Sequence, residues 1–382
     1  MRLNVRFPKV DPHTYELPET CPYGCGGQAY RRHGFKGERK SLRDVGYDEV
    51  VSYRYTCAQC GHTFRVYPRG VSKGAQQSKR LRAMTVLLYV LGLSYGAVED
   101  FVCALGCGVG KTTVYNNVQA AGQVARSKQQ ARVQRGGKRE VIGADGTFVK
   151  VKGESVGIEV VVDDSTGELL GLDIVTSENH EEVRKVIQEV VEAVEPEVLV
   201  TDEHGAYTAV VDELGLERQI CRSHVKRNVD DIADSLNQHL AHPEPLPEGA
   251  ELTPEQVRKD LGEMQRLVRE RPPDGEEQLE EMYDRYKDVP IPQPRQRHSV
   301  WYRMRMAVTR LWLHWRNLTL DQHRDDLDGT NNTCERLIGW WIKERYRTMR
   351  GYKRTESIRN VVTLTAQIGA CQGYYDLAGL VA

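Results

Sequence analysis

Between Glu140 and Asn228 the chain reads Val-Ile-Gly-Ala-Asp145-Gly-Thr, then Val-Leu-Val-Thr-Asp202-Glu-His-Gly, and then Cys221-Arg-Ser-His224-Val-Lys-Arg227-Asn228. Asp145 and Asp202 each follow a short apolar run rich in Val and Ile, which predicts two buried strands. A carboxylate at the carboxyl end of a buried strand faces the crevice in which open α/β sheets bind ligands. The first two motifs therefore predict a pair of carboxylates at one edge of a sheet.

Two carboxylates on neighbouring strands repel each other unless a cation neutralises them. Hard oxygen ligands of this kind suit Mg²⁺ or Mn²⁺. Each aspartate taken alone is more simply explained as a turn or helix N-cap residue, because Asp is common at both. The metal-site interpretation therefore depends on a third acid and on the modules that flank this region.

At 382 residues, with 40% hydrophobic and 28% charged residues, the chain has the composition of a globular protein of two or three domains. A net charge of -1 excludes a global field that would hold the chain on a polyanion, so any nucleic-acid contact must come from local basic patches. No apolar run approaches the roughly 20 residues of a membrane span. The first residues lack the apolar segment of a signal peptide, so we expect a cytoplasmic protein.

Four of the nine cysteines form two close pairs, Cys21 with Cys25 and Cys57 with Cys60. Two tight pairs so far apart are typical of a four-thiolate Zn²⁺ site, with chance doublets or disulfides as the alternatives. Residues 47–56 between the pairs alternate like a strand, so we predict a zinc ribbon over residues 1–72. Its many Arg and Lys residues either contact the DNA backbone or form a solvated basic face.

Two helical patterns follow, over residues 79–93 and from Ser94, an N-cap residue. A glycine-rich turn over residues 106–110 then leads into a third helix, an order typical of a helix-turn-helix, with a structural helical hairpin as the alternative. Candidate DNA contacts open this third helix: Lys111, Thr112, Thr113, Tyr115 and Asn116. The Gly-Lys-Thr at this point is no P-loop, because the motif requires Gly where the chain has Leu105.

Residues 125–139 are basic, polar and punctuated by glycine, which predicts a linker that can also lie on DNA. After the linker the pattern predicts strands over 140–145, 157–163 and 168–175, a helix over 181–194, a strand over 198–201, a helix over 206–214, a short strand over 218–221 and a helix from about Val225. Three strands, helix, strand, helix, strand is the order of the ribonuclease H-like fold.

Residues 230–328 differ in character, because proline-rich segments separate charged helical patterns. We predict an all-helical insertion with helices over 261–269, 278–286 and 300–318. The tryptophans and arginines of its last helix either pack in a core, the usual fate of aromatics at helical spacing, or form a DNA-facing surface.

A further helix is predicted to start near Thr333, with Glu335 in its first turn, where the helix dipole favours a carboxylate. Glu335 is either a third metal ligand or a surface acid that complements the dipole. A dense basic run follows it and suits a phosphodiester substrate: Lys343, Arg345, Arg347, Arg350 and Lys353.

These motifs together resemble those of DDE transposases of prokaryotic insertion sequences, with kinship to the Mutator-like group. The resemblance rests on the motifs around Asp145 and Asp202, on the Cys-x-x-His motif with its following Arg-Asn, and on Thr330-Asn-Asn-Thr-Cys-Glu335-Arg. It implies a multidomain α/β protein: a ribonuclease H-like mixed sheet with a helical insertion, preceded by a zinc ribbon and a helix-turn-helix. The implied boundaries are 1–72 for the ribbon, 73–124 for the helix-turn-helix, 125–139 for the linker, 140–229 and 329–375 for the catalytic core, and 230–328 for the insertion.

The resemblance also implies that Asp145, Asp202 and Glu335 form a catalytic triad that binds two Mg²⁺ or Mn²⁺ ions. The implied activity is cleavage at the terminal inverted repeats of an element, followed by attack of the freed 3′-hydroxyl on target DNA. The implied partners are double-stranded DNA and a second copy of the chain, and the implied location is the nucleoid. The alternatives are a transposase-derived DNA-binding protein without catalysis and a ribonuclease H-like nuclease without strand transfer.

The third motif has an open role. Cys221 and His224 are either a second metal-binding pair or structural residues that dock the insertion onto the core, together with Arg227 and Asn228. Two ligands alone do not make a zinc site, and buried cysteine is common, so we favour the structural role.

Overall fold

The computed structural model describes residues 4–176, 180–241, 252–293, 298–349, 351–369 and 374–381. The chain divides into two compact units. The terminal unit comprises residues 1–135, 148–156 and 337–382, and the central unit comprises residues 136–147 and 157–336. Within the described ranges, no helix is both long and apolar enough to cross a membrane.

A five-stranded sheet organises the central unit, in the spatial order β10-β9-β8-β11-β12. The strands are β8 (Val141–Val151), β9 (Glu154–Asp163), β10 (Leu169–Val175), β11 (Val198–Thr201) and β12 (Glu217–Ile220). β10 pairs antiparallel with β9, whereas β11 lies parallel to both β8 and β12. The sheet is therefore mixed, and its parallel half brings the ends of β11 and β12 to one edge.

Two helices connect the later strands, α4 (His180–Val194) and α5 (Gly205–Leu214). α4 buries an apolar face at helical spacing that includes Val183, Ile187 and Val190, as the sequence pattern predicts. α5 ends at Gly215, which adopts the left-handed conformation that glycine tolerates best. The predicted order of three strands, helix, strand, helix and strand is confirmed.

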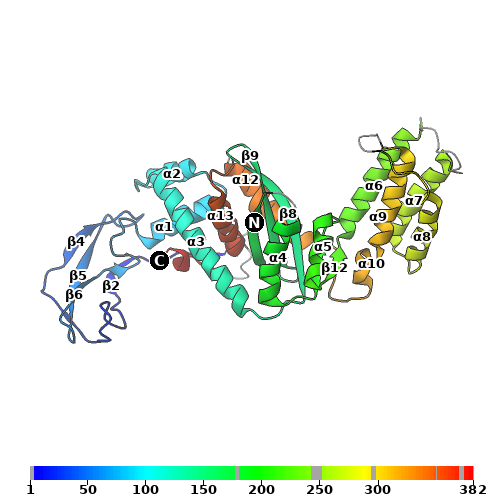
Figure 1. The fold of residues 1–382 in the computed structure, drawn as a ribbon. Coiled ribbons are helices and arrows are strands. Elements are labelled where there is room, and N and C mark those ends of the chain that lie inside the picture. The colour runs from blue at the N-terminus through cyan, green and yellow to red at the C-terminus, as the bar shows by residue number, and fades with distance from the viewer. Residues whose placement is uncertain are drawn as a thin grey trace. The chain divides into compact units, whose positions relative to one another are not determined.

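A helical bundle follows β12 (Figure 1). Its helices are α6 (Arg222–His239), α7 (Pro254–Glu270), α8 (Gly275–Tyr286), α9 (Val300–Leu313) and α10 (Trp315–Leu318), followed by the short turn η1 (Leu320–Gln322). Trp301 and Trp315 are buried in one apolar cluster with side chains from every helix of the bundle. Trp312 packs against the same cluster and stacks on Tyr283. The core interpretation of these tryptophans is confirmed.

The terminal unit begins with small sheets. β1 (Val5–Arg6) pairs with β13 (Tyr375–Asp376), and β2 (Asp11–Tyr15) pairs with β7 (Pro68–Arg69). The long strand β5 (Glu49–Cys57) pairs antiparallel with β3 (Tyr30–Arg32), β4 (Glu38–Ser41) and β6 (Thr63–Val66). The strand predicted between the cysteine pairs is thus confirmed as the centre of this sheet.

Three helices then follow, α1 (Lys79–Val90), α2 (Tyr95–Ala104) and α3 (Lys111–Arg135). Ser94 caps α2 as predicted, because its Oγ accepts a hydrogen bond of 3.2 Å from the amide of Ala97. The linker interpretation of residues 125–139 is wrong for most of its length, since α3 continues unbroken to Arg135. Ala125 and Val133 are buried on this extension, and that burial outweighs the polar composition of the segment.

The terminal unit is completed by the end of the described chain. α11 (Asn332–Leu337), which belongs to the central unit up to Arg336, continues into the terminal unit as a π-helical segment η2 (Ile338–Lys343) and α12 (Glu344–Met349). α13 (Thr355–Gly369) and η3 (Leu377–Leu380) follow. α13 packs along α3. Their closest approach is at Gly122, where a Cβ would lie 2.6 Å from Cβ of Asn360 and 2.7 Å from its carbonyl oxygen. Only glycine fits there, so Gly122 sets the separation of the two helices.

Gly122→Ala should therefore destabilise the terminal unit by about 1–3 kcal/mol, because the added methyl meets backbone atoms that no rotamer change can move. Helix propensity alone would predict the opposite, a more stable protein, because it favours Ala over Gly. The measurement is thermal unfolding together with amide hydrogen exchange in α3 and α13. Gly96→Ala is the matched control, because a Cβ there meets nothing closer than Oγ of Ser94 at 4.0 Å. A Gly122→Ala protein as stable as the wild type would contradict this account of the helix contact.

Candidate functional site

Asp145 and Asp202 lie beside each other through the register of two parallel strands. β11 pairs with β8 from Val198 opposite Val141 to Val200 opposite Gly143. Continuing that register by two residues sets Asp202 opposite Asp145. β8 was predicted to end at Asp145 but runs on to Val151, because the hairpin to β9 extends it, while its pairing with β11 stops at Gly143. Asp145 therefore emerges just beyond the end of β11.

Arg218 holds the backbone around Asp202. Its guanidinium donates hydrogen bonds of 2.7 Å to the carbonyl of Asp202, 3.1 Å to the carbonyl of His204, and 2.9 Å to Oγ1 of Thr201. Arg218 is buried on β12, and that burial lowers the pKa of its guanidinium to about 10. The carboxylate itself accepts a 2.9 Å bond from the amide of His204. Sequence reasoning missed Arg218, since an arginine in a short strand carries no motif.

Glu335 lies in the first turn of α11, as predicted. The residue that fixes this turn is the buried Asn331, whose Nδ2 donates a 2.9 Å bond to the carbonyl of Ala144, next to Asp145. The amide of Asn331 points at Sγ of Cys221 at 3.3 Å, and its carbonyl accepts a 3.0 Å bond from the amide of Glu335. Asn331 thus ties the turn of the third acid to both β8 and the end of β12. The sequence analysis named this asparagine only as part of the motif that contains Glu335.

The three acids share an unfavourable electrostatic environment. Burial, the largest cause, and the negative charges of Asp202 and Glu335 together raise the pKa of Asp145 to about 7, against an opposing effect of His224. A carboxyl group with a pKa of about 7 is only about half ionised at neutral pH, and a bound cation would favour its charged form. A cation bound beside these acids would therefore stabilise their ionised forms.

Cys221 and His224 lie next to Glu335. Cys221 is the N-cap residue of α6, and its sulfur lies 4.0 Å from Oε1 of Glu335. Nδ1 of His224 lies 3.3 Å from the same oxygen. Burial acts to raise the pKa of the Cys221 thiol, but the contacts with His224 and the Asn331 amide outweigh it and lower that pKa. The His224 pKa is raised to about 9, chiefly through its contact with Cys221.

The end of the same motif contacts the helical bundle. Asn228 donates a 2.5 Å hydrogen bond to the buried carboxylate of Glu203, which also forms a 3.2 Å ion pair with Arg310 on α9. Glu203 directly follows Asp202, so α6 and α9 both attach to the loop that carries the second acid. Arg227 is exposed on α6.

The four N-terminal cysteines converge. Their sulfurs all lie within 4.8 Å of one another, with 3.7 Å between Cys21 and Cys60 and 3.6 Å between Cys25 and Cys57. A tetrahedral ion with Zn–S bonds of about 2.3 Å would hold its sulfurs about 3.8 Å apart. The cluster is therefore compatible with zinc binding without rearrangement.

The residues predicted to contact DNA at the start of α3 differ in exposure. Lys111, Thr112 and Asn116 are exposed, and Thr113 is half-buried. Tyr115 packs inward instead, with its ring against Tyr95 and its hydroxyl 3.3 Å from Oγ of Ser357. Its ring thus serves packing within the terminal unit.

The basic run after Glu335 is only partly available to a ligand. Lys343, Arg347 and Lys353 are exposed, whereas Arg350 lies outside the described residues. The prediction that Arg345 contacts DNA phosphates is wrong, because this side chain is buried. Its guanidinium lies 3.9 Å from the ring centroid of Tyr89 and donates to the carbonyl of Leu93 at 3.0 Å.

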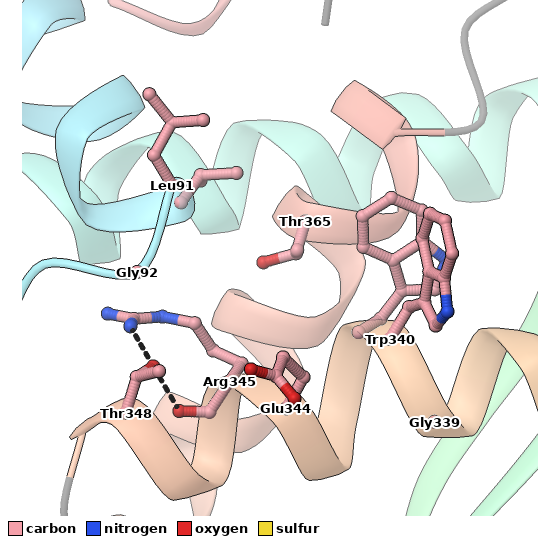
Figure 2. Close-up of a pocket in the computed structure, with 10 residues that line it drawn as sticks. Leu91, Gly92, Gly339, Trp340, Glu344, Arg345, Thr348 and Thr365 are labelled. Atoms are coloured by element: carbon pink, nitrogen blue, oxygen red, sulfur yellow. Dashed lines mark hydrogen bonds between the residues drawn. The ribbon is translucent and has the colours of Figure 1, made fainter. Parts of the chain in front are cut away.

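Figure 2 shows where the Arg345 side chain lies, in a pocket of about 430 Å³ between α1 and the η2–α12 helix. Its hydrogen bond to Thr348 measures 2.8 Å, and Trp340 lies further along the same wall. Arg345 therefore joins helices of the terminal unit, a role that helical spacing alone does not reveal.

Comparison with known proteins identifies the family of this chain. The model of the transposase IS66 family matches residues 74–347. Two solved structures of the HTLV-2 integrase catalytic core domain in complex with magnesium, in trimeric and dimeric forms, also match, at 15% and 16% identity. They cover 34% and 32% of this chain and 84% and 83% of their own, each with a TM-score of 0.20, a likeness too low to carry an argument. No curated protein matches. Because the family model spans well over half of the chain, this protein belongs to the transposase IS66 family.

Proposed function

We propose that this transposase cleaves the ends of its element and joins them to target DNA with Asp145, Asp202 and Glu335 as its catalytic residues. The observation that carries the proposal is the parallel register that sets Asp145 beside Asp202, with the turn of Glu335 tied to the same strand by Asn331. Burial, the largest cause, and the charges of Asp202 and Glu335 raise the pKa of Asp145, which supports grouping these acids from three separate elements into one site. Such an arrangement is costly without a cation, which favours a metal-dependent site over a structural one.

The donor set fits Mg²⁺ or Mn²⁺. All three proposed ligands are carboxylates, the hard oxygen donors that these ions prefer. When bound, a pair of such ions activates a water or a DNA 3′-hydroxyl and stabilises the leaving oxygen. Asp145 and Asp202 would be shared ligands, and Glu335 would complete the set.

The other residues of the site position these carboxylates. Arg218 fixes the backbone carbonyls of Asp202 and His204, and Asn331 fixes the turn of Glu335 relative to Ala144. Neither side chain needs to reach the DNA. Positioned ligands lose little freedom when substrate binds, which is how a rigid site contributes to catalysis.

Recognition of the element ends is proposed for the terminal unit. A zinc ion held by Cys21, Cys25, Cys57 and Cys60 would join the segment before β3 to the end of β5 and the turn that follows it. The exposed side chains at the start of α3 are proposed to read base edges in the major groove, as the last helix of a helix-turn-helix does. Lys343, Arg347 and Lys353 would contact phosphates, which carry no sequence information. Two element ends must be handled together, so we propose a dimer on DNA.

Asp145→Asn, Asp202→Asn and Glu335→Gln should each abolish cleavage of element-end DNA while leaving its binding within a few-fold. Each change removes one negative charge from the shared ion site with little loss of packing. The assay is Mg²⁺-dependent strand cleavage alongside gel-shift binding. Asp212→Asn, on the exposed face of α5, is the matched control and should cleave normally. Cleavage that survives in any of the three site variants would remove that residue from the triad.

The purified chain should carry zinc in its N-terminal ribbon, and Cys57→Ser should release it. Because the small sheet around β5 has little apolar core of its own, metal loss should unfold it locally. Zinc content by mass spectrometry and hydrogen exchange over residues 21–66 would measure both effects. Cys103→Ser removes an exposed cysteine outside the cluster and should change neither. Freshly purified protein without zinc would refute the ribbon site.

Asn116→Ala in the full chain should lower the ratio of specific to nonspecific DNA binding, with about 1–3 kcal/mol lost for one good base contact. Arg347→Ala should instead weaken binding to all sequences and flatten its salt dependence. Binding to repeat and random duplexes at several salt concentrations separates these effects. Gln123→Ala, exposed two turns further along α3, is the control for Asn116. Equal losses on repeat and random DNA in Asn116→Ala would contradict base readout by α3.

A further inference from the structure

The part of the site around Cys221 has a donor set unlike that of the three acids. A cysteine sulfur, an imidazole nitrogen and a carboxylate oxygen, from Cys221, His224 and Glu335, all lie within 4.8 Å of one another. Thiolate and imidazole are the ligands that select zinc-like ions over magnesium. The sequence analysis did not group Glu335 with Cys221 and His224, because more than a hundred residues of chain separate them.

The spacing of these atoms fits one tetrahedral ion. Bonds of about 2.0–2.3 Å to nitrogen, oxygen and sulfur place neighbouring ligand atoms about 3.3–3.6 Å apart. The observed separations from Oε1 of Glu335 are 3.3 Å to Nδ1 of His224 and 4.0 Å to Sγ of Cys221. A shift of a few tenths of an ångström in one side chain would bring the sulfur into place.

The surroundings also suit a metal-bound thiolate. Cys221 is fully buried at the N-terminus of α6, where the helix dipole stabilises negative charge. The backbone amide of Asn331 points at its sulfur at 3.3 Å, a contact of the kind that orients metal ligands from the outer shell. Within the described ranges, nothing gives the buried Nδ1 of His224 a hydrogen bond of regular geometry. That nitrogen lies 3.3 Å from Oε1 of Glu335 and within 4.8 Å of the Cys221 sulfur.

We propose that Cys221, His224 and Glu335 form a second zinc site, in which Zn²⁺ competes with Mg²⁺ for Glu335. Three protein ligands leave a fourth position open, as in zinc sites that exchange their fourth ligand. A zinc ion here would hold Oε1 of Glu335 beside His224 on α6, where that oxygen is no longer free for an ion at the other two acids. The competition rests on the proposed function of Glu335, whereas the zinc site itself does not.

The zinc site is tested by counting metal, without DNA and without cleavage. Full-length protein titrated with Zn²⁺ at micromolar concentrations, then desalted, should retain two equivalents, one in the ribbon and one here. Cys221→Ser and His224→Asn should each retain one, because losing a ligand weakens binding by about 10–100-fold or more. Cys103→Ser should retain two. One equivalent in the wild type, or two in Cys221→Ser, would overturn the proposal.

Cobalt identifies which ligands hold the second ion. In a Cys57→Ser background, which removes the ribbon site, added Co²⁺ should still give the thiolate-to-metal charge-transfer band. The band should vanish when Cys221→Ser is added, and also with His224→Asn, which keeps the thiol and so controls for misfolding of the serine variant. A band that survives both changes would assign the ion elsewhere.

Competition is tested by the effect of zinc on each protein's own Mg²⁺-dependent cleavage. Zinc at two equivalents should slow cleavage by the wild type and by Cys103→Ser about tenfold or more, because both lose an essential Mg²⁺ ligand. It should slow cleavage by His224→Asn by a smaller factor. Equal inhibition in all three would overturn the competition. A second zinc equivalent in a protein that never cleaves would instead uphold the site and refute the proposed function.

Discussion

The repulsion between Asp145 and Asp202 is the constraint on which the rest of the central unit depends. Parallel pairing of β8 with β11 brings the two carboxylates to the same level, just where that pairing ends. The cost is visible in the pKa of Asp145, which burial and its neighbours raise to about 7. A sheet that places like charges together is stable only when other interactions hold the strands in place.

Among those interactions are the hydrogen bonds of Arg218 and Asn331, which go to groups other than the carboxylates of the site. Arg218 donates its hydrogen bonds to backbone carbonyls and to the hydroxyls of Thr201 and Thr208. Asn331 likewise bonds to the backbone of β8 instead of the acids. Gly143 makes room for it, since a Cβ there would lie 2.9 Å from Oδ1 of Asn331. The scaffold therefore fixes the positions of the carboxylates while leaving their charge for a ligand.

Local patterns in the sequence predicted much of this architecture, whereas contacts between distant segments were beyond it. Alternation and apolar runs located the strands of the five-stranded sheet and the strand β5, and the Ser94 cap with helical spacing located the early helices, because these signals act over a few residues. The burial of Arg345 against Tyr89 and the extension of α3 to Arg135 depend on partners far away in the chain. A basic side chain looks the same in sequence whether it meets a phosphate or an aromatic ring. The closeness of Glu335 to Cys221 and His224 was missed for the same reason.

The terminal unit has a consequence for how the protein is made. Its first strand, β1, pairs with β13, and α3 packs along α13, so segments from the two ends of the described chain complete one another. The whole central unit is synthesised between them. During translation more than two hundred residues are synthesised after α3 before α13, which covers its apolar face, is made. The helices of the bundle, in contrast, are consecutive in the chain and can pack together as soon as they are made. Such long-range pairing is slow and leaves apolar surface exposed, which makes the nascent N-terminal segment a natural client for chaperones.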